Sequence, residues 1–281
     1  MKSGANKKHK SSVFSALFSN PEALRELYSA IEGIELSPDS IISINTLSDV
    51  LFMKQINDVS FTIDDRIVVL IEHQSTINNN VPLRLLMYIA RVFEKIIERE
   101  KLYQKKIEKI PTPEFIVLYN GKEPYPDREE LRLSDSFLKA EGVKVPGNNG
   151  FTLELVVHVY NINHGRNPGI LARSKTLDGY SIFMSKIKEY NSEQSLEESI
   201  KTAIKYCIKN EILVQFLKEH GPEVINMLTD ELSIEEIAAV RYREGREESR
   251  EEIARKALAK GVSIDLIQEI TGLSAEEIGK L

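Results

Sequence analysis

Two acidic residues, Asp58 and Glu72, lie near the far ends of two apolar segments that we expect to form paired strands. The segments are residues 57–63 and 67–74, and residues 64–66 between them suit a tight turn. A three-residue loop sets Asp58 directly opposite Glu72, where facing Cβ atoms lie about 4.5–5.5 Å apart. Two carboxylates that close usually share a proton or a divalent cation. The hairpin is therefore the first candidate for a chemical site.

The apolar residues of the two segments decide the pairing register. With a three-residue loop, Val59 faces Ile71 and Phe61 faces Val69, which gives one wholly apolar face. A two-residue turn would pair Val59 with Leu70, and neither face would then be consistently apolar. The apolar match therefore favours the register that brings the two carboxylates together.

The polar face of this hairpin has the ligands of a hard cation. Residues i and i+2 of a strand share a face, so Gln74 lies beside Glu72 while His73 points the other way. We interpret His73 as a hydrogen-bonded core histidine, and we expect Ser60 and Thr62 to keep the Asp58 face polar and accessible. Mg²⁺ binds one or two carboxylates and keeps its other positions for water and phosphate oxygens. Such an ion lowers the pKa of bound water and polarises a phosphoryl oxygen. These two effects are the minimum requirement for phosphodiester hydrolysis.

Strands alternating with helices around the hairpin predict an α/β fold, with a small mixed central sheet flanked by helices and a helical C-terminal region. Asn20 and Pro21 predict a helix start, and Gly33 its end. Ser195, Ser233 and Ser274 each precede a glutamate by three residues and predict capping boxes. The other expected elements are strands at 41–47, 50–54, 115–119 and 151–160, a helix from Pro82 with a stripe of Leu83, Leu86, Met87, Ala90, Phe93 and Ile97, a loop-rich stretch at 127–149, and helices from Pro168 onward.

Composition narrows the class of protein. The chain has 281 residues, a formal net charge of −6 and a single cysteine, Cys207. One cysteine excludes an intramolecular disulfide and suits a reducing compartment. No apolar run reaches the roughly 18 residues that span a bilayer, and the N-terminus is a poor signal peptide. We therefore expect a cytoplasmic protein whose residues 1–11 form a basic flexible tail.

Several segments of the chain resemble one nuclease family. The Asp58 and Glu72-x-Gln74 pattern resembles the PD-(D/E)XK nuclease superfamily, which has an Asp on one strand and a Glu-x-Lys on the next. More closely, the chain resembles the recombination-promoting nuclease and putative transposase family within it. The segments that carry the likeness are NDVSF (57–61), LIEHQST (70–76), PLRLLMY (82–88), IPTPEFIVLYNG (110–121), ELRLSD (130–135) and NIN (161–163).

The resemblance implies a fold, a reaction and a cofactor. It implies a restriction-endonuclease-like core over residues 12–190, followed by a helical region over 191–281. It also implies a DNA endonuclease that depends on Mg²⁺ or another divalent cation and hydrolyses phosphodiester bonds. In that reading Asp58 and Glu72 ligate the metal and the carbonyl of His73 completes the site. A link to recombination or mobile DNA is implied by the same resemblance.

Gln74 departs from the superfamily pattern, because an amide cannot supply the positive charge of the usual lysine. Gln74 can still orient a water molecule or a phosphate, and Lys54 is a candidate for the missing charge. Arg84 and Tyr88, one turn apart on the expected helix, are candidates for contacting a DNA phosphate or bracing Gln74, and the alternative is a surface Arg84 and a core Tyr88. The acidic residue of the superfamily's first helix is not settled, and Glu22 and Glu26 remain the alternatives.

The C-terminal residues alone do not decide whether this region binds DNA or another protein chain. Residues 263–271 and 274–281 predict two short helices around a tight turn, an outline that resembles a helix-turn-helix. The second helix opens with Glu276 and Glu277, and a helix N-terminus that reads base edges should not present two carboxylates to DNA. We therefore interpret these helices as a packing or oligomerisation element, through which copies of the chain could form a homo-oligomer. The alternatives to a DNA endonuclease are a non-catalytic DNA-binding or oligomeric interaction protein, and an enzyme that cleaves RNA.

Overall fold

The computed structural model describes residues 12–44, 58–138 and 152–279. For residues 58, 234–245 and 248 within this range the structure describes the backbone alone. The chain divides into two compact units between Met227 and Leu228. The first unit contains a six-stranded sheet, and the second is helical.

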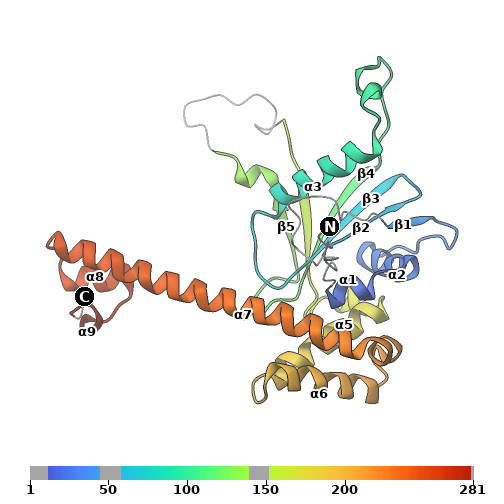
Figure 1. The fold of residues 1–281 in the computed structure, drawn as a ribbon. Coiled ribbons are helices and arrows are strands. Elements are labelled where there is room, and N and C mark those ends of the chain that lie inside the picture. Colours follow the sequence, from blue (N-terminus) through green and yellow to red (C-terminus); the bar gives the residue numbers. More distant parts are fainter. Residues whose placement is uncertain (1–11, 45–57, 139–151, 280–281) are drawn as a thin grey trace, which may run out of the picture. The chain divides into compact units, whose positions relative to one another are not determined.

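The sheet has the strand order β1-β2-β3-β4-β6-β5 (Figure 1). Strands β3, β4 and β6 run parallel to one another, whereas β1, β2 and β5 join antiparallel to their neighbours. The strands are β1 (Ile42–Ile44), β2 (Asp58–Ile63), β3 (Ile67–Gln74), β4 (Thr112–Tyr119), β5 (Arg128–Arg132) and β6 (Val156–Asn161). This mixed sheet with flanking helices confirms the predicted α/β class.

The β2–β3 hairpin has the register that the apolar pattern predicts. Ile63 pairs with Ile67, Phe61 with Val69, Val59 with Ile71, and Asp58 with Glu72. The loop closes with a hydrogen bond from the Arg66 amide to the Ile63 carbonyl, at 2.9 Å. Asp64 and Asp65 take positive φ angles of 50° and 52°, a conformation that aspartate tolerates better than most residues.

One face of the sheet is covered by helix α3 (Val81–Ile96). Its side chains pack on strand residues such as Leu70 and Val117. The helix is predicted correctly, but its buried stripe is not the expected one: Leu83, Met87 and Ala90 are exposed. The stripe that packs inward consists of Val81, Pro82, Leu85, Ile89 and Val92. The helix is apolar on more than one side, so periodicity alone could not select the side that contacts the sheet.

The opposite face is covered by helices α1 (Val13–Leu17), α2 (Pro21–Glu32) and α5 (Lys175–Tyr190). Phe14 of α1 and Tyr180 of α5 contact His73, and Tyr28 of α2 contacts Phe61. The predicted start of α2 is confirmed, because the Asn20 side chain accepts a hydrogen bond from the Ala23 amide. The short helix α4 (Pro168–Leu171) precedes α5, and α6 (Leu196–Lys209) packs on α5.

The remaining helices are α7 (Val214–Ala259), α8 (Ile264–Thr271) and α9 (Ala275–Ile278). The predicted box at Ser274 is confirmed in full, and the Ser195 side chain caps α6 by accepting from the Glu198 amide. The box at Ser233 is wrong, because Ser233 lies inside α7. In the part of the chain that the structure describes, no helix combines the length and apolarity needed to cross a membrane.

Two sequence predictions differ from the structure in smaller ways. Residues 127–149 were expected to be loop-rich, yet β5 and the 3-10 turn η2 (Leu133–Ser136) lie within them. The strand expected over 41–47 is observed at Ile42–Ile44, and the rest of it lies outside the described residues, as does the strand expected at 50–54. A second 3-10 turn, η1 (Arg99–Tyr103), follows α3.

Candidate active site

The two predicted acidic residues are Cα partners in the β2–β3 ladder, and Asp58 is the first residue of β2. The face that Glu72 occupies is not the accessible polar face that we expected. Ser60, Thr62 and Glu72 are only 4%, 8% and 3% exposed. The expectation is wrong because α3 packs over this face. Glu72 is therefore a buried carboxylate.

Glu72 is held through one of its two carboxylate oxygens. The Gln74 side-chain amide donates to Glu72 Oε1 at 2.6 Å, and the Arg84 guanidinium forms an ion pair with the same oxygen. Glu72 Oε2 is buried and has no hydrogen-bond partner among the described residues. A buried acceptor without a partner costs about 1–3 kcal/mol, and more when it is charged. Oε2 is thus the carboxylate oxygen of Glu72 whose hydrogen-bonding capacity the described residues leave unsatisfied.

Arg84 stays charged at this site. Burial lowers the pKa of its guanidinium, but Glu72 and Tyr88 act in the opposite direction and raise the pKa of Arg84 overall. The Arg84 side chain is 22% exposed, and Gln74 and Tyr88 are also half-buried. Gln74, Arg84 and Tyr88 therefore form a partly exposed rim beside the deeper Glu72.

His73 lies on the other face of the sheet, as its place in the strand predicts. Its Nε2 is 3.2 Å from the Tyr180 hydroxyl in a buried hydrogen bond, and its ring stacks on Phe14 with centroids 4.9 Å apart. Burial, with a smaller contribution from Lys188, lowers the pKa of His73 to about 3. The interpretation of its side chain as a hydrogen-bonded core histidine is confirmed. Whether its backbone carbonyl binds a metal stays a prediction.

The donor set suits a hard divalent cation such as Mg²⁺. Carboxylate oxygens are the ligands that Mg²⁺ prefers, and ligating carboxylates are usually oriented by further hydrogen bonds. Glu72 meets both conditions, since Oε1 is fixed by Gln74 and Arg84 while Oε2 has no described partner. No cluster of three or more His, Cys, Asp and Glu side chains suited to a metal occurs in the described residues, a set that does not include the Asp58 side chain.

Two further sequence candidates have other surroundings, and one lies outside the described residues. Glu26 accepts hydrogen bonds from the Ser174 hydroxyl at 2.7 Å and the Thr176 amide at 3.1 Å, so it holds the N-terminus of α5. Glu22 is exposed in the first turn of α2. Lys54 lies outside the described residues. The choice between Glu22 and Glu26 as the acidic residue of the first helix stays open.

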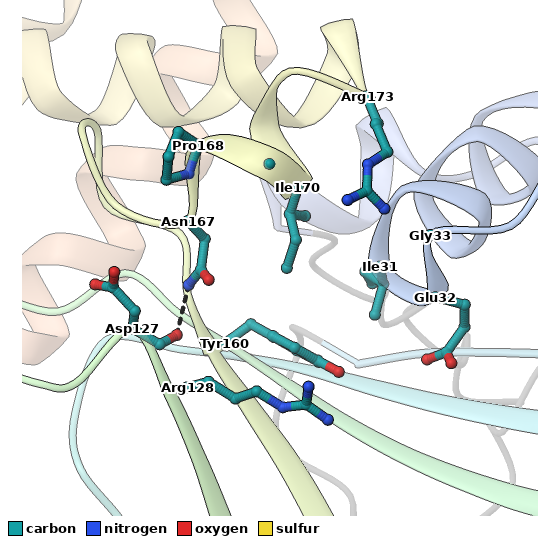
Figure 2. Close-up of a pocket in the computed structure, with 11 residues that line it drawn as sticks. Ile31, Glu32, Gly33, Asp127, Arg128, Tyr160, Asn167, Pro168, Ile170 and Arg173 are labelled. Carbon is teal, nitrogen blue, oxygen red and sulfur yellow. Dashed lines mark hydrogen bonds between the residues drawn. The ribbon is translucent and has the colours of Figure 1, made fainter.

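A recess of 490 Å³ lies on the opposite side of the sheet from Glu72 (Figure 2). Glu72 pairs with Val117 and Val117 with Val159, so the next residue, Tyr160, faces the other way. Tyr160 lies across the recess and the Arg128 guanidinium lies 5.4 Å from the centre of its ring. Burial and Glu114 raise the pKa of Glu32, which lines the recess. No local pattern in the sequence indicates this recess, because its lining comes from segments far apart in the chain.

The fold is α/β, and comparison with known families shows which protein family the chain belongs to. Residues 7–158 match the family described as "Putative transposase, YhgA-like", and residues 246–281 match the C-terminal HTH domain of the Rpn/YhgA-like nuclease family. The first match covers more than half of the chain, which therefore belongs to the YhgA-like family. No curated protein and no solved structure gave a significant match.

The second match corrects the interpretation of the C-terminal helices as a packing element. Helices α8 and α9 are joined at Gly272, whose φ of 69° ends α8. The carboxylates of Glu276 and Glu277 were expected to disfavour DNA at this helix end. The Glu277 side chain, however, turns back and accepts hydrogen bonds from the Ser274 amide and hydroxyl, each at 2.7 Å. Glu277 thus completes a capping box, and its charge is engaged within its own helix. The homo-oligomer stays a prediction.

Proposed function

We propose that this protein is a DNA endonuclease that hydrolyses phosphodiester bonds at a Mg²⁺ site made by Asp58 and Glu72. The observation that carries the proposal is the register of β2 and β3, which makes Asp58 the direct partner of Glu72. Residues opposite each other in an antiparallel pair share a face of the sheet. The buried Glu72 Oε2, which has no described partner, supports a cation ligand at this position.

Each residue of the site has a distinct task in this proposal. Asp58 and Glu72 bind the cation, which supplies an activated water and stabilises charge on the phosphate. Arg84 and Gln74 hold Glu72 Oε1, so that the other oxygen keeps its direction. Gln74 also orients water or phosphate at the partly exposed rim, where Arg84 and Tyr88 meet the DNA backbone. The carbonyl of His73 is a further metal ligand in the same proposal.

The family matches support the choice of DNA as substrate. One match is to a transposase-like family and the other is to an HTH domain of a nuclease family. We propose that the HTH unit binds DNA and delivers it to the nuclease site, because helix-turn-helix domains generally place a helix in the major groove. A role in recombination or with mobile DNA is part of the same proposal.

One observation favours a second candidate, a non-catalytic DNA-binding protein. The positive charge of Arg84 already neutralises Glu72, and Gln74 replaces the lysine of the superfamily pattern. In that candidate the ion pair is a purely structural replacement for the metal. The two candidates differ in whether the protein cleaves DNA when Mg²⁺ is present.

A plasmid-nicking assay distinguishes the two candidates. Wild-type protein is expected to nick supercoiled DNA with Mg²⁺ and to be inactive with EDTA, while Asp58→Asn and Glu72→Gln lose activity. Asp65→Asn is the matched control, because Asp65 lies in the turn at the other end of the same hairpin. Native cleavage by Asp58→Asn would reject the proposed site. Parallel reactions with single-stranded RNA test the RNA alternative.

A further inference from the structure

Lys188 of helix α5 occupies a polar cage at the carboxyl ends of two parallel strands. Its ammonium group donates to the carbonyl oxygen of Asn120 at 2.8 Å, to Asn120 Oδ1 at 2.9 Å and to Asn163 Oδ1 at 2.9 Å. The carbonyl oxygen of Gly121 is 3.4 Å away. Asn120 directly follows β4, and Asn163 comes two residues after β6. One lysine therefore fixes the ends of two neighbouring strands.

The same cage is attached to the end of β3, where Gln74 lies. The backbone amide of Asn120 donates to the backbone carbonyl of Gln74 at 2.8 Å. The residue that Lys188 holds is therefore also hydrogen-bonded to the backbone of Gln74. Gly121 packs so tightly that a Cβ there would overlap the Ser75 carbonyl oxygen and the Tyr119 ring. The backbone after Gln74 and the backbone after β4 are therefore in direct contact.

The strength of the hydrogen bonds from Lys188 favours a rigid connection between the ends of β4 and β6. Asn120 is only 3% exposed, and hydrogen bonds from a charged donor are roughly twice as strong as those between neutral groups. The ammonium has three donors and finds at least three good acceptors within the cage. Removing its charge would leave buried carbonyl and amide oxygens without a donor, so the strand ends would lose a common anchor.

We propose that Lys188 is a positioning residue for the proposed nuclease site, acting on Gln74 through Asn120 and Gly121. The inference rests on the proposed function, and it gives a role to the YNG and NIN segments, which the proposed catalytic residues leave unexplained. Lys188 holds the strand end that carries Gln74, and Gln74 in turn holds Glu72 Oε1. Loss of Lys188 lets the Glu72 carboxylate and the orienting amide depart from their productive geometry.

The test compares Lys188→Met and Lys188→Arg with the matched control Lys186→Met. Lys186 lies on the same helix and pairs with Glu189 instead. With a short duplex substrate and saturating Mg²⁺, Lys188→Met is expected to lose about tenfold or more in kcat, as misplaced groups do, with KM near the native value. Lys188→Arg recovers part of the loss, and Lys186→Met keeps the native rate.

A second measurement separates the inference from the nuclease itself. In NMR spectra the side-chain amide resonances of Gln74 are expected to shift in Lys188→Met and to stay in place in Lys186→Met. A native kcat together with unmoved Gln74 resonances in Lys188→Met would overturn the inference. If the wild-type protein cleaves nothing, the nuclease proposal fails and so does the contribution of Lys188 to cleavage. The Gln74 resonances still decide whether Lys188 anchors the end of β3.

Discussion

Arg84 of α3 and Glu72 of β3 form an ion pair between the helix and the face of the sheet that it covers. The guanidinium engages one oxygen of the carboxylate, and the second oxygen has no partner in the described residues. A cation bound at that second oxygen would not need to displace Arg84. In the proposed site, Glu72 would therefore contact two positive charges, the permanent charge of Arg84 and an exchangeable cation from solution.

Arg84→Met is expected to lower the free energy of unfolding by about 3 kcal/mol, because Glu72 would stay buried without its counter-ion. Millimolar Mg²⁺ should restore part of this loss by binding the unpaired carboxylate. Urea denaturation with and without Mg²⁺ measures both effects. The control is Arg91→Met on the same helix, where an exposed pair with Glu94 should contribute less than about 1 kcal/mol. Equal stability of the two variants would show that the buried pair contributes nothing.

Gln74→Leu is expected to reduce the cleavage rate by about 100-fold, because it removes a donor that orients Glu72 and the water or phosphate. Gln74→Lys keeps a donor and adds the charge that the superfamily pattern has, so it should cleave at least as fast as the wild type. Initial rates of plasmid nicking at saturating Mg²⁺ measure both variants. A Gln74→Leu protein with the native rate would remove Gln74 from the site.

Acid should destabilise the fold through His73. Burial and Lys188 lower its pKa from 6.5 to about 3, so between these values the unfolded chain binds more protons than the folded one. The stabilisation is complete above pH 6.5 and falls by up to about 1.4 kcal/mol per pH unit as the pH drops towards 3. Urea denaturation at several pH values should show a flatter dependence for His73→Gln, which cannot titrate. Identical slopes for the two proteins would contradict the assignment.

Ile267→Ala is expected to destabilise the C-terminal unit by about 2–5 kcal/mol and to weaken DNA binding. Ile267 is fully buried and packs with Ala254 and Ile278. Leu266→Ala is the control, since Leu266 is the preceding residue of α8 and is exposed. Thermal denaturation and fluorescence anisotropy with a duplex DNA measure the two properties. Native DNA affinity in a destabilised Ile267→Ala protein would show that the HTH unit does not carry the DNA contact.

The register of the hairpin could be predicted from sequence because the apolar residues of its two strands favour a single pairing. The apolar residues Val59, Phe61, Val69 and Ile71 match in only one register, and a one-residue slip would leave neither face of the hairpin consistently apolar. The α/β class followed in the same way from alternating apolar segments. Chemistry that depends on residues within one hairpin is therefore accessible to sequence analysis.

Features that depend on distant segments were not predictable in this way. Strand β5 was missed because its charged residues give no apolar signal, and only its pairing with β6 makes it a strand. The burial of Glu72 depends on which side of α3 meets the sheet. The cage around Lys188 joins residues 120, 163 and 188, and nothing in their local sequence indicates that they meet.

The outer strand β5 also differs from the interior of the sheet. It alternates exposed Arg128, Glu130 and Arg132 with partly covered Glu129 and Leu131. A charged edge discourages backbone pairing with another molecule. Growth of the sheet by addition of a neighbour's strand, the first step towards fibrils, is therefore disfavoured at this edge.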